Sequence, residues 1–202
     1  MKKLRRAFAD RRPAEMGFSL VELLIYSVLS VVVLFIVGGI LINSLTVARS
    51  VREASEASNA GQLVATSVGH GVRNANEIWQ SAPGIVPQIL MVRTVGSEDT
   101  PNWRCQAWSY DSGEIRTTAS AAAISTVQTS DSVESWMLLA EGVQPLIVAA
   151  VPAPVFTVAG QRVNLALDMS TGEGQPVLIS TSSVSRHPFE PIGGLPTCIP
   201  HP

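Results

Sequence analysis

One carboxylate, that of Glu22, most restricts the chemistry open to this chain. Across residues 18–42 the only other ionisable side chain is that of Tyr26, and most of the stretch is apolar. A helix over this range rises about 1.5 Å per residue and is long enough to cross a hydrocarbon core of about 30 Å. Because a carboxylate in lipid is costly, Glu22 needs a specific partner or role.

A local role for Glu22 comes from the start of the helix itself. Ser19 and Glu22 fit the S-x-x-E capping box, in which the two side chains satisfy free amides at a helix start. The other interpretation is a positively charged partner, which would offset the cost of placing each charge in lipid. The two interpretations are compatible.

Other residue types that perform chemistry are present but scattered. His70, His187 and His201 lie far apart, and no His, Cys, Asp or Glu cluster has metal-ligand spacing. No serine lies in a G-x-S-x-G elbow. Asp168 and Glu173 flank one turn and could bind calcium, but a solvated hairpin tip explains them without a metal. We therefore expect a chain that is not an enzyme, with no catalytic residue, metal site or cofactor.

The charge of the chain is distributed unevenly. Residues 1–17 hold six of the fourteen basic residues and two of the sixteen acidic ones, so the remainder carries eight arginines against fourteen acids. Positive residues before an apolar helix hold that end in the cytoplasm, which predicts a single-pass protein with its bulk across the membrane. An acidic exported part makes nucleic acid an unlikely main partner, because phosphate binding needs clustered Lys and Arg.

The residues around Glu22 match a known signal. A basic leader ends in Gly17, Phe18 follows it, and Glu22 comes four residues later. This pattern resembles the class III signal of type IV prepilins and type II secretion pseudopilins. The resemblance implies cleavage between Gly17 and Phe18 by prepilin peptidase, N-methylation of Phe18, and pairing of Glu22 with the Phe18 amine of a neighbouring subunit. The apolar run alone would instead suggest an uncleaved signal anchor.

The apolar helix is predicted to continue as an amphipathic one. We divide the chain into a leader at 1–17, a transmembrane and assembly helix at 18–42, an amphipathic continuation at 43–80 and an extracytoplasmic β-rich domain at 81–202. One face of the continuation recurs at spacings of four and three. It contains Val47, Val51, Ala54, Ser58, Gly61, Ala65, Val68, Val72, Ala75 and Trp79. Residues this small favour packing on a β-sheet over a coiled coil.

The C-terminal part is predicted to form strands and turns. The candidate strands are residues 88–95, 103–110, 114–118, 136–140, 146–151, 155–158, 162–169 and 177–185. A Ser/Ala/Thr-rich stretch at 119–132 is predicted to be a loop. The tail at 187–202 has five prolines and cannot form an interior strand. The fold class is therefore α+β, with a long N-terminal helix packed on a mostly antiparallel sheet, which is also the pilin-like architecture that the resemblance implies.

The two cysteines, Cys105 and Cys198, both lie beyond the apolar helix, on the side assigned to an oxidising compartment where disulfides persist. A bridge would anchor the proline-rich tail, which cannot pair through most of a sheet edge. The alternative is two unpaired cysteines, one in the core and one on the tail. We expect the bridge between Cys105 and Cys198, which requires Cα atoms within about 7 Å, a distance that the sequence does not show.

The leading function is that of a minor pilin or pseudopilin. Segments at 103–116, 138–143 and 181–186 are similar to those of W-type minor pilins and J-type minor pseudopilins. The implied partners are prepilin peptidase, other pilin or pseudopilin subunits, the inner-membrane assembly platform and membrane lipid. The alternative is a fibre-tip subunit that binds surfaces or DNA. A type IV pilus, a type II secretion system and a competence pilus all remain open as the machine that the chain serves.

Overall fold

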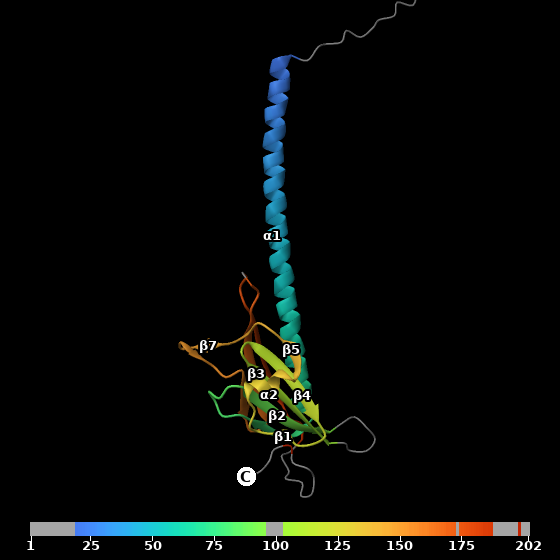
Figure 1. Ribbon diagram of the computed structural model, residues 1–202, viewed down its shortest axis with the longest axis vertical. Helices are drawn as coiled ribbons and strands as arrows, with labels where there is room; N and C mark the ends of the chain where they lie inside the picture. The colour runs from blue at the N-terminus through green and yellow to red at the C-terminus, as the bar shows by residue number, and fades with distance from the viewer. Residues whose placement is uncertain (1–18, 96–102, 173, 188–197, 199–202) are drawn as a thin grey trace, which may run out of the picture. The chain divides into compact units, whose positions relative to one another are not determined.

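The computed structural model describes residues 19–95, 103–172, 174–187 and 198, and the chain divides into two compact units, Met1–Val47 and Ala48–Pro202 (Figure 1). The boundary falls inside α1 (Leu20–Arg73), a continuous helix of 54 residues. The first unit contains the apolar part of α1, and the second contains the rest of α1 and all the strands.

The described part of the first unit is a single helix that begins at Leu20. Its first turn is closed by the Leu23 amide, which donates to the Ser19 carbonyl at 3.1 Å. The large apolar side chains from Leu20 to Leu45 are exposed, and none of the most apolar window of the helix is buried within the structure. By length and composition this helix could span a membrane, as the apolar run predicts.

In the second unit, α1 packs through a face of small residues. Its buried positions recur at helical spacing and are Ala57, Gly61, Val64, Val68, Gly69, Gly71 and Val72. The exposed face carries two ion pairs with i,i+4 spacing, Arg49–Glu53 at 3.1 Å and Arg52–Glu56 at 3.3 Å. The packing of a small-residue helical face on an antiparallel β-domain is confirmed, and with it the α+β class. The predicted face is wrong at its start, because Val47 and Val51 are 54% and 63% exposed and burial begins only at Ala57.

The helix ends earlier than the sequence predicted. We expected it to run to residue 80, but α1 stops at Arg73 and β1 (Ala75–Gln80) follows at once. The segment pairs with β2 (Gln88–Val95) in antiparallel register, with Trp79 opposite Met91. Its aromatic and β-branched residues favour a strand. Tertiary pairing therefore overrides the apolar spacing that had extended the helix to Trp79.

A five-stranded antiparallel sheet forms most of the β-domain, in the order β1-β2-β3-β4-β5. The remaining strands are β3 (Trp103–Asp111), β4 (Glu114–Ser120) and β5 (Met137–Ala140). β2 is buried on both faces. Leu90 and Val92 join α1 in the main core, whereas Ile89 and Met91 join a second cluster on the other face.

A second antiparallel sheet has the order β11-β10-β6, with β9 also paired to β10. Its strands are β6 (Val143–Pro145), β9 (Phe156–Ala159), β10 (Arg162–Met169) and β11 (Val177–Val184). The alternation predicted for residues 162–169 is confirmed, since Val163, Leu165, Leu167 and Met169 are buried. These residues share the main core with Val64, Val68 and Trp108.

Two further predictions about this part of the chain are wrong. Residues 146–151 do not form one strand. They belong to a tight hairpin of β7 (Ile147–Val148) and β8 (Val151–Pro152), because Ala149 and Ala150 adopt positive φ values of 50° and 64°. The stretch at 119–132, expected to be a loop, runs into α2 (Ser130–Glu134), which begins inside it. Thr129 and Ser132 form a capping box at its start, with serine in the position that glutamate or glutamine usually occupies.

Candidate functional site

Of the three residues of the predicted processing signal, the structure describes one. Gly17 and Phe18 lie outside the described residues, as does the tail at 188–197. Glu22 is described and lies in the first turn of α1.

Glu22 makes a bond along the helix. Its Oε1 accepts a hydrogen bond from the Tyr26 hydroxyl at 3.1 Å, one turn further on. Among the described residues no capping-box bond joins Glu22 to Ser19, although the Ser19 carbonyl does accept the first helical bond. We noted Tyr26 in the sequence as ionisable but did not predict that it pairs with Glu22. Its position four residues after Glu22, one helical turn away, could have predicted the contact.

The surface around Glu22 is apolar. Leu23 is 66% exposed and Leu29 is 55% exposed, and no cationic side chain of the described residues pairs with Glu22. A neutral hydroxyl offsets little of the cost of a carboxylate in an apolar environment. The arrangement therefore suits a cation that arrives from outside the described part of the chain.

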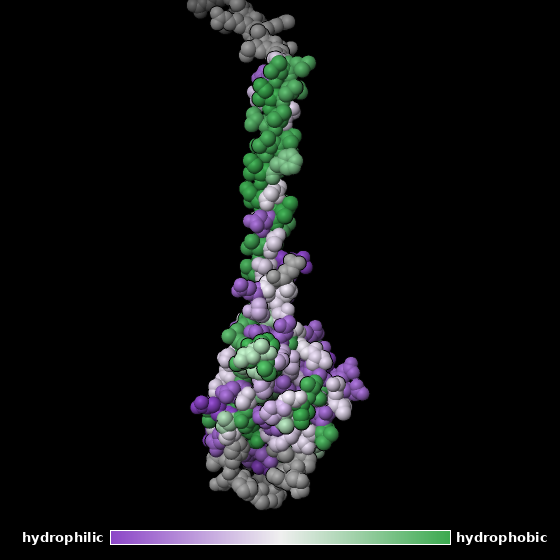
Figure 2. Space-filling model, turned by 90° about the vertical axis from the view of Figure 1, so that its left-hand side faces the viewer, coloured by the Kyte–Doolittle hydropathy of each residue, from purple (hydrophilic) through white to green (hydrophobic). Residues whose placement is uncertain are grey.

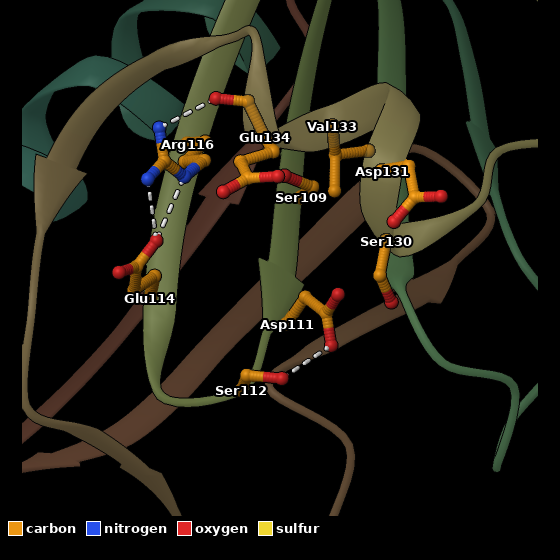
Figure 3. Close-up of a pocket in the computed structure, with 9 residues that line it drawn as sticks. All are labelled: Ser109, Asp111, Ser112, Glu114, Arg116, Ser130, Asp131, Val133 and Glu134. Atoms are coloured by element: carbon orange, nitrogen blue, oxygen red, sulfur yellow. Dashed lines mark hydrogen bonds and ion pairs between the residues drawn. The ribbon is translucent and has the colours of Figure 1, made fainter.

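A second feature is a polar pocket of about 230 Å³ between the β3–β4 turn and α2 (Figure 3). Asp111, Glu114, Asp131 and Glu134 line it together with Arg116. Arg116 is fully engaged: its guanidinium pairs with Glu114 at 2.7 Å and donates to the carbonyls of Glu134 and Trp136 at 2.9 and 3.0 Å. This network fastens α2 to the sheet. Across the residues that the structure describes, no group of three or more His, Cys, Asp or Glu side chains could hold a metal ion.

Tyr110 lies on β3 next to the pocket residue Asp111. Burial, and to a smaller extent the negative charge of Asp111, raises the pKa of the Tyr110 hydroxyl above its usual value. Deprotonation of the Tyr110 hydroxyl therefore requires a higher pH than that of an exposed tyrosine.

The structure joins Cys105 and Cys198 by a disulfide, with their Cα atoms 5.3 Å apart. Both cysteines are buried in the second cluster, with Met91 and Val133 among the other members. Of the two possibilities that the sequence left open, the structure contains the bridge. It ties Cys198 to the face of the five-stranded sheet that α2 also covers.

One buried charge was missed entirely at the sequence level. Arg93 is 3% exposed, donates to Asn76 Oδ1 at 2.9 Å and lies 3.5 Å from Glu77 Oε2, so it links β2 to β1. Its guanidinium also lies 5.2 Å from the ring centroid of Trp103. These contacts are those of a buried structural ion pair that joins the edge strand β1 to β2.

Comparisons with protein-family models, with curated proteins and with solved structures find no match for this chain.

Proposed function

We propose that this chain is a structural subunit, a minor pilin or pseudopilin, of a type IV pilus or a type II secretion-like fibre. Prepilin peptidase cleaves it between Gly17 and Phe18, Phe18 is N-methylated, and the apolar part of α1 anchors the subunit in the inner membrane before assembly. The β-domain lies on the extracytoplasmic side. Its partners are other pilin or pseudopilin subunits and the membrane assembly platform.

The observation that carries the proposal is the position of Glu22. It lies in the first turn of an exposed apolar helix, where the described residues provide a hydroxyl but no cation. Cleavage after Gly17 would create a positive amine on Phe18, four residues before Glu22. Pairing that amine with the Glu22 of a neighbour offsets the cost of both charges in lipid.

The rest of the chain supports the same role. The second half of α1 buries small residues against an antiparallel β-domain, so one helix is both an apolar rod and a part of the domain core. The disulfide between Cys105 and Cys198 is consistent with an exported domain.

Intact-mass measurement of the membrane-extracted chain tests the proposal. Co-expression with an active prepilin peptidase should remove residues 1–17 and add one methyl group to Phe18, whereas a strain without the peptidase should leave the full chain. A bulky residue in Gly17→Leu should block cleavage, and Gly39→Ala, in the same helix, should not. Retention of the leader in wild-type protein beside an active peptidase would show that the proposal is wrong.

A further inference from the structure

The β7–β8 hairpin is an apolar projection from the β-domain. Its six residues, 147–152, carry no charged or hydrogen-bonding side chain, and Ile147, Val148 and Val151 are each more than 60% exposed. Figure 1 shows it extending away from the sheets, and Figure 2 views that side, where apolar surface is bordered by polar surface. An exposed apolar element bordered in this way typically marks an interaction surface.

The turn of this hairpin is also unusual. A two-residue loop with positive φ at both positions is of the type I′ kind, which favours Asn-Gly or Asp-Gly. Here both positions are alanines, which lack the freedom of glycine and the polar contacts of asparagine. The sequence therefore keeps the tip small and apolar against the local conformational preference, and such outliers concentrate at functional sites.

The chemistry of the hairpin narrows the class of partner. Nucleic acid requires cations, and lipid-surface elements typically use basic and aromatic residues, none of which occurs at 147–152. A small aliphatic element without charge fits an apolar groove of a protein, where it would leave no polar group unpaired.

The same β-domain contains such a groove. It encloses about 570 Å³ between α1, β5 and the end of β10, and Ala57, Ala60, Leu138, Ala140 and Met169 provide its apolar surface. It exists because α1 carries alanines here, which leave space beside β5. Three carboxylates lie at its rim: Glu53 and Glu56 are already paired with arginines of α1, and Glu141 is exposed to solvent. No cationic side chain of the described residues lines it.

Figure 1 shows β5 near α1 on one side of the domain and the β7–β8 hairpin projecting from the other, so the groove that α1 and β5 line is turned away from the hairpin. A hairpin so placed meets the groove of another copy rather than its own. We infer that the β7–β8 hairpin of one copy docks in the α1–β5–β10 groove of a second copy. Contacts between two different patches are heterologous and repeat from copy to copy, as a fibre requires.

The strength of this contact should be modest. A six-residue hairpin buries much less than the roughly 1,200 Å² of a stable interface, so isolated copies should associate weakly. The inference therefore rests on the proposed function, because apolar helices that hold copies side by side raise their effective concentration. The contact must accordingly be tested in the membrane.

Cysteine cross-linking in membranes of the full-length chain provides the test. The two native cysteines are bridged and do not react with a short bismaleimide. The double variant Val148→Cys/Leu138→Cys should give dimers, trimers and longer products, because each copy carries both halves of the contact. Each single variant alone should stay monomeric, and the two singles co-expressed should give dimers only.

A matched pair provides the controls. Val127 is 81% exposed and lines neither surface, so Val127→Cys/Leu138→Cys should give no ladder. In the Val148→Cys/Leu138→Cys background, Val151→Asp should reduce the ladder about tenfold, because it buries an unpaired charge, whereas Val127→Asp should not. Self-linking of Val148→Cys alone, or a monomeric double variant, would overturn the inference. A monomeric double variant that is still cleaved and methylated would overturn the docking inference and leave the proposed function intact. A cross-linked ladder from a chain that is never cleaved would support the docking contact and overturn the proposed function.

Discussion

Gly71 is the position at which the structure makes its sharpest prediction about stability. It lies on the buried face of α1 against Trp108, which is fully buried. A Cβ at residue 71 would lie 3.0 Å from Trp108 Cζ2, would be closer still to Cη2, and would lie 3.2 Å from Gln106 Oε1. Trp108 cannot withdraw freely, because its Nε1 donates to Ser67 Oγ at 2.9 Å.

Two opposing effects set the magnitude for Gly71→Ala. Alanine gains about 1 kcal/mol of helix propensity over glycine. The added methyl group overpacks a rigid aromatic contact, which typically costs about 1–3 kcal/mol, and the closeness of the Trp108 ring favours the upper half of that range. The net expectation is a loss of about 1–2 kcal/mol in the free energy of unfolding, or a melting temperature lower by about 2–8 °C for a chain of this size.

Thermal unfolding of the full-length chain in detergent, followed by near-UV circular dichroism, measures this loss. Gly39→Ala is the matched control, since a Cβ there meets nothing within 4 Å. In a Trp108→Phe background the outer ring atoms are absent, so Gly71→Ala should become stabilising by about 1 kcal/mol. A stabilising effect of Gly71→Ala in the wild-type background would refute the proposed contact between α1 and β3.

Three further predictions concern the ionisable residues and the disulfide. Glu22→Gln should leave cleavage intact but reduce incorporation into the fibre, measured in sheared fibre fractions, whereas Tyr26→Phe should preserve incorporation. Equal incorporation of Glu22→Gln and wild type would favour a purely local role for Glu22. Reduction of the bridge between Cys105 and Cys198, 93 residues apart, should lower the free energy of unfolding by about 4–5 kcal/mol in urea titrations, and an unchanged midpoint would contradict this. Because the pKa of Tyr110 is raised, the folded chain keeps a proton that the unfolded chain loses near pH 10. The free energy of unfolding should therefore fall as the pH rises above about 10 and through the folded pKa. Tyr110→Phe should flatten that decline.

The strands of the β-domain show how far local pattern reaches. The alternation at residues 162–169 predicts β10 with its bounds and its buried side, because a period of two exposes one face of a sheet to the core. The same reasoning joins residues 146–151 into one strand, where the chain in fact reverses at Ala149 and Ala150. Alanine carries no turn signal, so no local pattern could have shown this hairpin.

The sequence by itself determined the features that depend on neighbours along the chain. These include the apolar helix, the isolated carboxylate Glu22, the basic leader that ends at Gly17, and the small-residue face that needs a sheet. Each is a matter of composition or helical spacing, which a single segment specifies.

The tertiary structure alone decided the features that depend on residues distant in sequence. The end of α1 at Arg73 follows from the pairing of β1 with β2. The burial of Arg93 follows from its contacts with Asn76 and Glu77. The bridge to Cys198 follows from the approach of the two cysteine Cα atoms to 5.3 Å. Strand pairing and side-chain burial are set by the chain as a whole, so a segment that fits either helix or strand is decided by the partner that it meets.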